Sequence, residues 1–294
     1  PNPTFWQGRK VVVTGHTGFK GAWLSLWLSE MGAKVLGLAL PPPTSPSLYE
    51  LANVSSIVDE VLGDIRDVKF ICHQINEWEP EIIFHLAAQS LVRESYEEPL
   101  ETIAINLMGT AHILEAARRQ SSVKTVVNIT TDKCYENKEW IWGYREIDAL
   151  GGSDPYSASK ACAELISVAY QKSFFQSEGV AIATARSGNV VGGGDWATDR
   201  LVPDIFRAYF KNQKLRLRYP DAVRPWQHVL EPLSGYLQLA ERLHNDADRY
   251  SGAWNFGPSP GVRYSVTEIL EKLQEIMGAN ITWEVLGALN EGET

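Results

Sequence analysis

Two groups of polar side chains in this chain have the types and the spacing of acid–base catalysts. In the first, Tyr156 and Lys160 stand four residues apart, directly behind Asp154 and Pro155. A proline at this place predicts the first position of a helix, and residues four apart share one helical face. The ammonium would favour the phenolate and lower the pKa of the phenol toward neutral, so that the phenol could act as a general base. A surface tyrosine–lysine pair is the alternative for this spacing alone.

The second group is the polar run at residues 130–133 (TTDK), which directly follows the apolar run at residues 126–129 (VVNI). If the apolar run is a buried parallel strand, the polar residues open at its carboxyl end, where open α/β sheets hold ligands. Hydroxyl, carboxyl and ammonium groups would then be directed into a cleft. The same residue types also suit a capped turn at a helix entry, so these residues alone leave both interpretations open.

The first element that must position these groups is a glycine-rich loop near the N-terminus. The β-branched run at residues 10–14 leads into residues 15–21 (GHTGFKG), after which apolar residues recur as in a helix. In this context Gly15 permits a tight turn, Gly18 lets backbone N–H groups approach a pyrophosphate, and Gly21 lets the helix lie close to the strand. The loop therefore predicts dinucleotide binding, and a βα turn without a ligand is the alternative.

Later strands are expected to complete the cofactor site. Asp64, after a third strand at residues 57–62, is placed to meet an adenine amino group, with a helix cap as the alternative. The second strand, residues 34–40, ends in prolines and has no acid for the adenosine ribose and no nearby arginine for a 2′-phosphate, which favours NAD over NADP. The residues expected to bind NAD are Gly15, His16, Thr17, Gly18, Phe19, Gly21, Asp64, Ile65, Leu86, Ala87, Ala88, Gln89, Asn106, Tyr156 and Lys160.

Strands that alternate with helices predict an α/β fold, a Rossmann-type doubly wound parallel sheet with a smaller C-terminal substrate-binding lobe. The chain is expected to cross into that lobe at residues 192–194 (GGG). We expect residues 1–186 and about 224–252 to form the dinucleotide-binding domain, and about 187–223 and 253–294 to form the substrate domain. Further expected elements are a long helix from Pro99, a sixth strand at 179–186, a surface loop at 244–249, a short strand at 254–257, and a helix at 266–277 ended by Gly278.

The composition argues against several classes of function. The net charge of −9, from 36 acidic and 27 basic residues, disfavours a nucleic-acid or anionic-membrane surface. No run of about 18 apolar residues occurs, and the first residues lack the apolar segment of a signal peptide, so we expect a cytoplasmic protein with no membrane partner. The 3 cysteines and 6 histidines have no disulfide or metal-ligand spacing, so no metal is expected.

The glycine loop, residues 131–133 and the Tyr-x-x-x-Lys motif, in this order, resemble the extended short-chain dehydrogenase/reductase family. Within it, the 4,6-dehydratases of nucleotide-activated hexoses place a Thr-Asp-acid triplet after the fifth strand. Lys133 stands here where the dTDP-glucose type has Glu, and residues 131–133, 186–196 (RSGNVVGGGDW) and 224–229 (RPWQHV) are similar to the CDP-D-glucose 4,6-dehydratases. The resemblance covers about residues 8–283, and family members usually run longer, which indicates a truncated C-terminus.

This resemblance implies a lyase that uses NAD to convert CDP-D-glucose into CDP-4-keto-6-deoxy-D-glucose. Tyr156 would take the proton of the sugar 4-hydroxyl while hydride passes to NAD, and Thr131 would hydrogen-bond the 4-oxygen. Lys133, if neutral, would remove the C5 proton, and Asp132, if protonated, would give a proton to the leaving 6-hydroxyl before hydride returns to C6. A lysine–aspartate pair prefers to be doubly charged, so which group removes the C5 proton stays open.

The remaining expectations concern the substrate, the assembly and rival functions. A nucleotide-diphosphate hexose, most of all CDP-glucose, would be bound by Asn189, Arg200, Arg224 and Asn255, although an isolated arginine is often a solvated surface residue. The resemblance also implies a homodimer or a dimer of dimers, formed through the helices at 99–119 and 156–177. The rivals are a nucleotide-sugar 4-epimerase or reductase of the same fold, which needs no acid–base pair after Thr131, and a dinucleotide-binding regulator without turnover.

Overall fold

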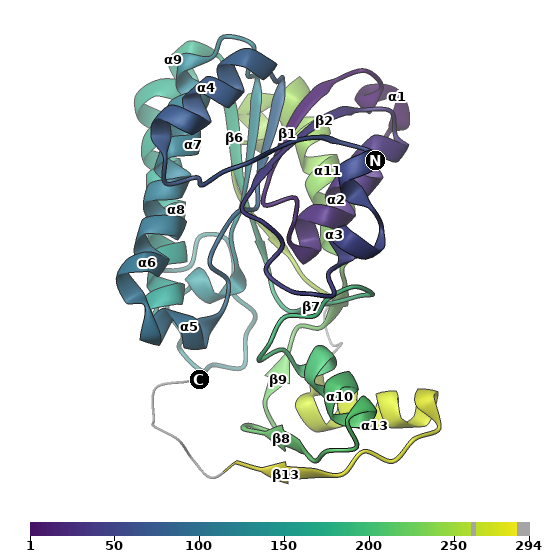
Figure 1. Cartoon of the computed structure of the whole chain (residues 1–294). Helices are drawn as coiled ribbons and strands as arrows, with labels where there is room; N and C mark the ends of the chain where they lie inside the picture. The colour runs from purple at the N-terminus through teal and green to yellow at the C-terminus, as the bar shows by residue number, and fades with distance from the viewer. Residues whose placement is uncertain (260–262, 287–294) are drawn as a thin grey trace.

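A seven-stranded parallel sheet forms the centre of the computed structural model, which describes residues 1–259 and 263–286 (Figure 1). Its strand order is β11-β6-β5-β4-β1-β2-β3, and every pairing in it is parallel. The strands are β1 (Lys10–Thr14), β2 (Lys34–Ala39), β3 (Asp59–Leu62), β4 (Ile82–His85), β5 (Thr125–Ile129), β6 (Ala181–Ser187) and β11 (Gly252–Phe256). The continuous apolar runs of β1 and β5 are buried on both faces, as parallel strands require. The predicted doubly wound sheet is confirmed.

Helices cover both faces of this sheet (Figure 1). On one face, Leu24 and Leu28 of α2 and Leu233 and Tyr236 of α11 pack against Val13 and its neighbours in a single apolar core. On the other face the helices α4 and α7 pack against β1, β2, β4 and β5 in a second core. The helices of these two layers are α1 (Pro3–Trp6), α2 (Phe19–Glu30), α3 (Leu48–Leu51), α4 (Val68–Trp78), α5 (Val92–Glu97), α6 (Pro99–Ile103), α7 (Thr110–Arg119), α8 (Pro155–Tyr170), α9 (Gln176–Glu178), α11 (Leu230–Asn245) and α12 (Ala247–Tyr250).

Local sequence signals explain where the two longest helical runs begin. Asp154 caps α8, because its carboxylate accepts a hydrogen bond from the backbone N–H of Ser157 at 2.9 Å, and Pro155 occupies the first turn. The predicted helix from Pro99 runs through α6, a π-helical segment η2 (Ala104–Gly109) and α7. The other short helical segments are η1 (Val54–Ser56), η3 (Asp132–Cys134) and the π-helical η4 (Gln171–Phe175).

A smaller lobe with its own apolar core lies beyond the carboxyl edge of the sheet (Figure 1). Its core contains Ile205, Leu215, Leu217, Leu270 and Ile281. The lobe is built from α10 (Leu201–Phe210), β8 (Leu215–Leu217), β9 (Val223–Arg224), β12 (Tyr264–Ser265), α13 (Val266–Met277) and β13 (Trp283–Val285), and the short pair β7 (Val190–Val191) and β10 (Gln227–His228) joins it to the sheet. Gly278 ends α13 in a left-handed conformation, as predicted.

Two expectations about the boundaries need correction. Residues 253–256 were assigned to the smaller lobe, but β11 pairs with β6 from Gly252 to Phe256 and is therefore an edge strand of the large sheet. Residues 244–249 were expected to form a loop, but they are the end of α11 and most of α12. The prediction for 287–294 lies outside the described residues. Among the residues that are described, no helix is both long and apolar enough to cross a membrane.

Candidate active site

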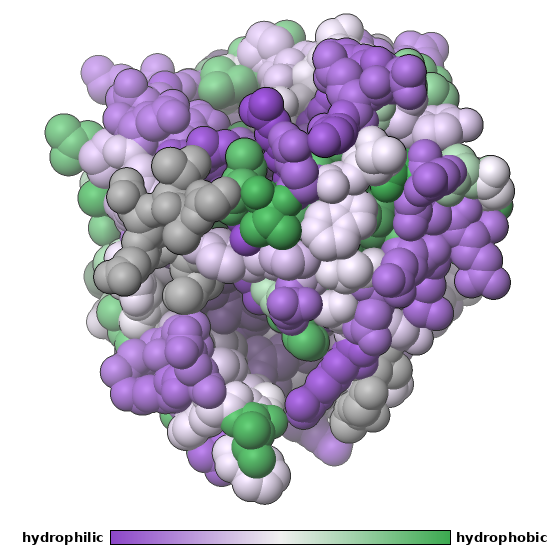
Figure 2. Space-filling model, turned by 90° about the horizontal axis from the view of Figure 1, so that it is seen from below, coloured by the Kyte–Doolittle hydropathy of each residue, from purple (hydrophilic) through white to green (hydrophobic). Residues whose placement is uncertain are grey.

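A cleft of about 1330 Å³ lies between the carboxyl edge of the sheet and the smaller lobe. It is lined by the glycine loop, by the residues that follow β2 to β6, by the start of α8 and by α10. The face seen from below is mostly hydrophilic, with small separate hydrophobic groups around a hollow (Figure 2). This is the place where open parallel sheets bind ligands.

The glycine loop has no room for side chains where it approaches the sheet. Gly15 has a φ of +76°, and a Cβ at this position would lie 2.8 Å from the backbone nitrogen of Ala87. A Cβ on Gly21 would lie 2.1 Å from the carbonyl oxygen of Gly15. Gly18 precedes α2 without any side-chain cap, so backbone N–H groups at the start of α2 are open to the cleft. A helix N-terminus in this form fits a dinucleotide pyrophosphate.

The expected cofactor residues divide into those that line the cleft and those that do not. His16 and Asn106 lie outside its lining, and the other thirteen expected residues line it: Gly15, Thr17, Gly18, Phe19, Gly21, Asp64, Ile65, Leu86, Ala87, Ala88, Gln89, Tyr156 and Lys160. The carboxylate of Asp64 holds the side chain of Arg66, whereas the cap of α4 is Asp67. The helix-cap alternative thus applies to Asp67 and not to Asp64.

His16 and Asn106 are turned toward the protein instead. The buried imidazole of His16 lies 2.9 Å from the carboxylate of Glu60, under Gly37, so this side chain is directed into the sheet. The side-chain amide of Asn106 accepts a hydrogen bond from the backbone N–H of Gln89 at 3.0 Å and donates one to the backbone carbonyl of Gln89 at 2.9 Å. Asn106 therefore positions the loop after β4 rather than facing the cleft.

The run at residues 130–133 is both a capped turn and part of the cleft wall. Thr131 caps η3, and its hydroxyl accepts a hydrogen bond from the backbone N–H of Lys133 at 3.3 Å. The same hydroxyl donates to the carboxylate of Asp132 at 3.1 Å. Because Thr131, Asp132 and Lys133 all line the cleft together with Tyr156 and Lys160, the two predicted groups meet in one place.

Burial dominates the acid–base properties of these groups. It raises the pKa of Tyr156 to about 12, although the Thr131 hydroxyl acts in the opposite direction. Lys160 donates to the carbonyl oxygen of Ile129 at 3.2 Å, and burial lowers its own pKa to about 8. The expectation that Lys160 brings the pKa of the phenol toward neutral is therefore wrong for the protein alone, in which Tyr156 is a neutral phenol.

Asp132 has the property that a proton donor needs. Burial raises the pKa of its carboxyl group, and this effect exceeds the opposing effects of the Lys133 charge and of the Thr131 hydrogen bond. Burial thus favours the protonated form of this carboxyl group more than water does. The expectation that Asp132 is protonated agrees in direction with its surroundings.

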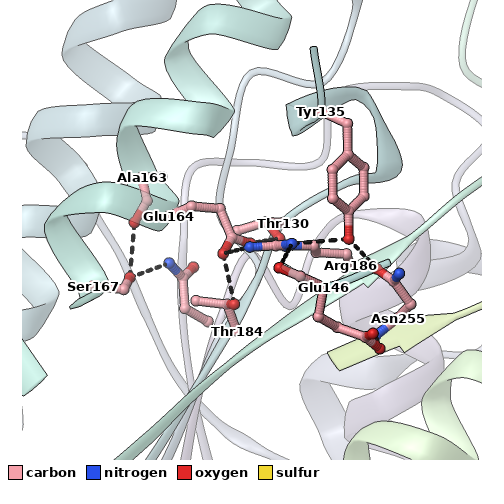
Figure 3. Close-up of polar contacts among 10 residues, drawn as sticks. Thr130, Tyr135, Glu146, Ala163, Glu164, Ser167, Thr184, Arg186 and Asn255 are labelled. Atoms are coloured by element: carbon pink, nitrogen blue, oxygen red, sulfur yellow. Dashed lines mark hydrogen bonds and ion pairs between the residues drawn. The ribbon is translucent and has the colours of Figure 1, made fainter. Parts of the chain in front are cut away.

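A buried ion pair supports the polar run from behind (Figure 3). The carboxylate of Glu164 in α8 accepts hydrogen bonds from Arg186 and Thr184 of β6, each at 2.7 Å. It also accepts one from the hydroxyl of Thr130. Arg186 donates to the hydroxyl of Tyr135 at 2.8 Å. Because both charged side chains are almost fully buried, the pair ties the ends of β5 and β6 to α8.

We expect Glu164→Gln to destabilise the fold by about 3–5 kcal/mol, because it leaves the buried Arg186 charge without its partner. Urea unfolding followed by tryptophan fluorescence measures this loss. The matched double variant Glu164→Gln/Arg186→Met removes both charges and is expected to lose less than the single variant. A single variant as stable as the unchanged protein would contradict this role for the pair.

Three of the four expected substrate residues line the cleft, and one does not. Asn189, Arg200 and Arg224 line the cleft, and Arg200 is paired with Asp195 at 3.1 Å. Asn255 lies outside the lining, and its amide accepts a hydrogen bond from the Tyr135 hydroxyl at 2.7 Å (Figure 3). The same amide donates to the carbonyl oxygen of Tyr144 at 2.9 Å. Asn255 thus holds the insertion before α8 instead of reaching the substrate.

Sequence reasoning missed several residues of the cleft wall. Lys20 lines the cleft and donates to the hydroxyl of Ser187 at 2.8 Å, and Arg216 and Arg218 line it from β8 and the residue after it. The available signal for Lys20 was a charge inside an otherwise apolar helical pattern. In the described ranges 1–259 and 263–286, no group of His, Cys, Asp and Glu is arranged to hold a metal ion.

Comparisons with known proteins agree with this geometry. A family model described as GDP-mannose 4,6 dehydratase matches residues 12–293. The CDP-glucose 4,6-dehydratase of Salmonella typhimurium is 53% identical over 284 residues, which are 95% of this chain and 79% of that protein. A UDP-glucose 4-epimerase of Halalkalibacterium halodurans is 25% identical, covering 94% of this chain and 82% of the epimerase.

Solved structures share the fold. MoeE5 in complex with UDP-glucose and NAD has a TM-score of 0.81 at 23% identity, covering 97% of this chain and 87% of MoeE5. DesIV, a dTDP-glucose 4,6-dehydratase from Streptomyces venezuelae, has a TM-score of 0.78 at 24% identity, covering 94% of this chain and 84% of DesIV. Both likenesses place the chain among Rossmann-like folds.

Proposed function

We propose that this chain, which belongs to the GDP-mannose 4,6-dehydratase family, is an NAD-dependent hydro-lyase that converts CDP-D-glucose into CDP-4-keto-6-deoxy-D-glucose. The observation that carries the proposal is one cleft that holds Thr131, Asp132, Lys133, Tyr156 and Lys160 behind a dinucleotide-type glycine loop. The choice of CDP-glucose is supported by the 53% identity to the Salmonella enzyme.

The residues that would hold NAD are the glycine loop, the small residues after β4, and Lys160. Backbone N–H groups at the start of α2 suit the pyrophosphate, and Ala87 and Ala88 leave space for a ribose. Bound NAD supplies the hydride acceptor for C4, the hydride donor for C6 and a positive ring charge in the cleft.

Tyr156 is the proposed base for the sugar 4-hydroxyl. Its phenol is buried and its pKa is about 12 in the protein alone, so its proton must become easier to lose when the cleft is filled. Lys160, one helical turn away, and the hydroxyl of Thr131 stabilise the negative charge that forms on the phenol. Because the Thr131 hydroxyl has a single proton, its hydrogen bond to the phenol or to the 4-oxygen of the sugar replaces the one to Asp132.

Asp132 and Lys133 are the proposed pair for the loss of water. Once C4 is a ketone, the C5 proton is acidic, and Lys133 is the group that takes it. Asp132 gives a proton to the 6-hydroxyl, which leaves as water. The raised pKa of Asp132 supports the acid role, while the base role of Lys133 is supported by its position in the cleft next to Asp132.

We propose that the smaller lobe binds the nucleotide diphosphate. Arg200, Arg224 and Asn189 line the cleft on this side, and arginine suits two-point contact with phosphate oxygens. The substrate domain would then comprise about residues 187–223, as expected from the sequence, together with Arg224 of β9 and the part of the chain after β11. A cytoplasmic location, where nucleotide sugars are made, belongs to the same proposal.

The direct test is incubation of the purified chain with NAD and, separately, CDP-glucose, UDP-glucose, dTDP-glucose and GDP-mannose. We expect a 4-keto-6-deoxy sugar from CDP-glucose at a higher rate than from the others. Formation of a C4 epimer without loss of water would replace this function by that of an epimerase. Binding of NAD without any turnover would favour the regulator.

We propose a homodimer that forms through the helices at 99–119 and 156–177. Leu100, Met108 and Leu165 of these helices are exposed, which leaves an apolar face available to a second copy. Leu165→Glu is expected to convert the dimer into a monomer in sedimentation experiments, whereas Leu51→Glu on the exposed part of α3 leaves it unchanged. A monomeric unchanged chain would refute this assembly.

A further inference from the structure

The side chain of Lys20 reaches from the glycine loop to the acid–base groups of the cleft. Lys20 is the second residue of α2, and its ammonium donates to the hydroxyl of Ser187 at 2.8 Å. The hydroxyl of Ser187 also accepts from the buried Tyr236 of α11 at 2.7 Å. One hydrogen bond therefore holds the ammonium at the carboxyl end of β6, inside the cleft, and the hydroxyl that accepts it is itself fixed by Tyr236.

The carboxylate of Asp132 lies at the same place. Its Oδ2 atom is 2.8 Å from the position that a Cβ would take on Gly188, the residue directly after Ser187. Both Lys20 and Asp132 line the cleft. Asp132 is one of the charged groups that act electrostatically on Lys20, so the two side chains lie in the same part of the cleft.

The charged groups around Lys20 come from three elements. Lys160 of α8 and Arg200 at the start of α10 disfavour its charged form, and Asp132 of η3 favours it. Burial has the largest effect and lowers the pKa of Lys20 to about 7, while burial raises the pKa of Asp132. The pKa of Lys20 is lowered and that of Asp132 is raised, so burial favours transfer of a proton from the ammonium to the carboxylate more than water does.

We propose that Lys20 supplies, by way of Asp132, the proton that the sugar 6-hydroxyl takes as it leaves. This inference rests on the proposed dehydration. The Lys20 ammonium gives its proton to the Asp132 carboxylate, the carboxyl group protonates the 6-oxygen, the C6–O bond breaks, and water departs. The proton that Tyr156 took from the 4-hydroxyl is available to recharge Lys20, so the turnover needs no external proton.

The proposal accounts for two features that the roles of Asp132 and Lys133 leave unexplained. A carboxyl group that gives up its proton in every turnover needs a source for the next one, and Lys20 is an ammonium whose pKa of about 7 allows release near neutral pH. A charged side chain also interrupts the otherwise apolar face of α2, where packing alone would favour an apolar residue.

Two substitutions of Lys20 test the proposal, each studied with NAD and CDP-glucose in a single turnover. Lys20→Met removes the proton, and Lys20→Arg keeps the positive charge but cannot release a proton near neutral pH. Both are expected to retain reduction of NAD and exchange of the C5 hydrogen with deuterated water, and to slow the loss of water by about 10²-fold or more. Lys34→Met, at the exposed start of β2, is the matched control.

A second substrate separates proton supply from a structural role. With CDP-6-deoxy-6-fluoroglucose, fluoride leaves without needing a strong proton donor, so both variants are expected to approach the rate of the unchanged enzyme. In the unchanged enzyme, loss of water from CDP-glucose is expected to slow as the pH rises through about 7, because the ammonium is the donor, and this dependence is absent in Lys20→Met.

Three outcomes would overturn the proposal. The first two are loss of water at the rate of the unchanged enzyme in Lys20→Met or in Lys20→Arg. The third is an equal decrease, in a variant, of the rates of fluoride loss from the fluorinated substrate and of water loss from CDP-glucose. Tryptophan fluorescence titration with NAD checks that the variants are folded. Because all rates are compared with the unchanged enzyme on the same substrate, a failure of the proposed function is recognised separately, as an unchanged chain that makes no product.

Discussion

Replacing Tyr156 by phenylalanine is expected to slow the reduction of NAD by CDP-glucose by about 10²–10⁴-fold, because the variant has no group to take the proton of the 4-hydroxyl. The phenol lies in the cleft on the same face of α8 as Lys160, and the loss of one oxygen leaves the apolar packing of the ring in place. Rapid mixing followed by the absorbance of reduced nicotinamide measures this step directly.

Tyr170→Phe is the matched control for this substitution. Tyr170 lies on the same helix, outside the lining of the cleft, and its hydroxyl is 3.4 Å from Glu115. We expect its rate of NAD reduction to be unchanged. If Tyr156→Phe reduced NAD as fast as this control, another group would have to be the base.

Replacing Lys133 by alanine is expected to leave NAD reduction intact and to stop the reaction before the loss of water. Reduced cofactor would then accumulate on the enzyme, and the C5 hydrogen would no longer exchange with deuterated water. This pattern differs from that of the Lys20 variants, which are expected to exchange the C5 hydrogen and to fail only at the C6–O bond. The reason is that Lys133 removes the C5 proton and Lys20 supplies the proton for the leaving hydroxyl.

Lys138→Ala serves as the control for Lys133, because Lys138 is an exposed lysine of the insertion that follows η3. Stopped-flow absorbance and mass spectrometry of the quenched sugar follow the two steps in one experiment. Normal product at the unchanged rate in Lys133→Ala would remove this lysine from the mechanism.

Features that depend on neighbouring residues were predictable from the sequence. Asp154 and Pro155 set the start of α8, and this start places Tyr156 and Lys160 on one helical face. Gly15 and Gly21 have close contacts that exclude side chains, as the spacing of the loop indicated. Alternating strands and helices were sufficient for the doubly wound sheet, because parallel strands need crossover helices.

Features that depend on distant packing were not predictable. The pairing of β11 with β6 joins segments about 70 residues apart, so the boundary of the smaller lobe was placed too early. The side chains of His16 and Asn255 were expected to reach the cofactor and the substrate. Their hydrogen bonds to Glu60 and Tyr135 direct them into the protein instead. The pKa of Tyr156 was expected to fall and is raised, because burial outweighs the nearby charges and spacing says nothing about burial.

Lys20 shows the same limit at the site itself. In the sequence it is one charge within an apolar helix, and only the fold brings it to Ser187 and beside Asp132. The polar run at residues 130–133 also needed the fold, because a capped turn and a catalytic wall use the same residue types. In the structure, residues 130–133 form a capped turn and are also part of the cleft wall.

Isotope labelling tests the central claim most directly. The chain is incubated with CDP-glucose and NAD in deuterated water, and the product is examined by NMR spectroscopy and mass spectrometry. Dehydration by way of a 4-ketone requires a 4-keto-6-deoxy sugar that carries deuterium at C5 and the original C4 hydrogen at C6. A sugar inverted at C4, with no water lost and no deuterium at C5, would contradict the account.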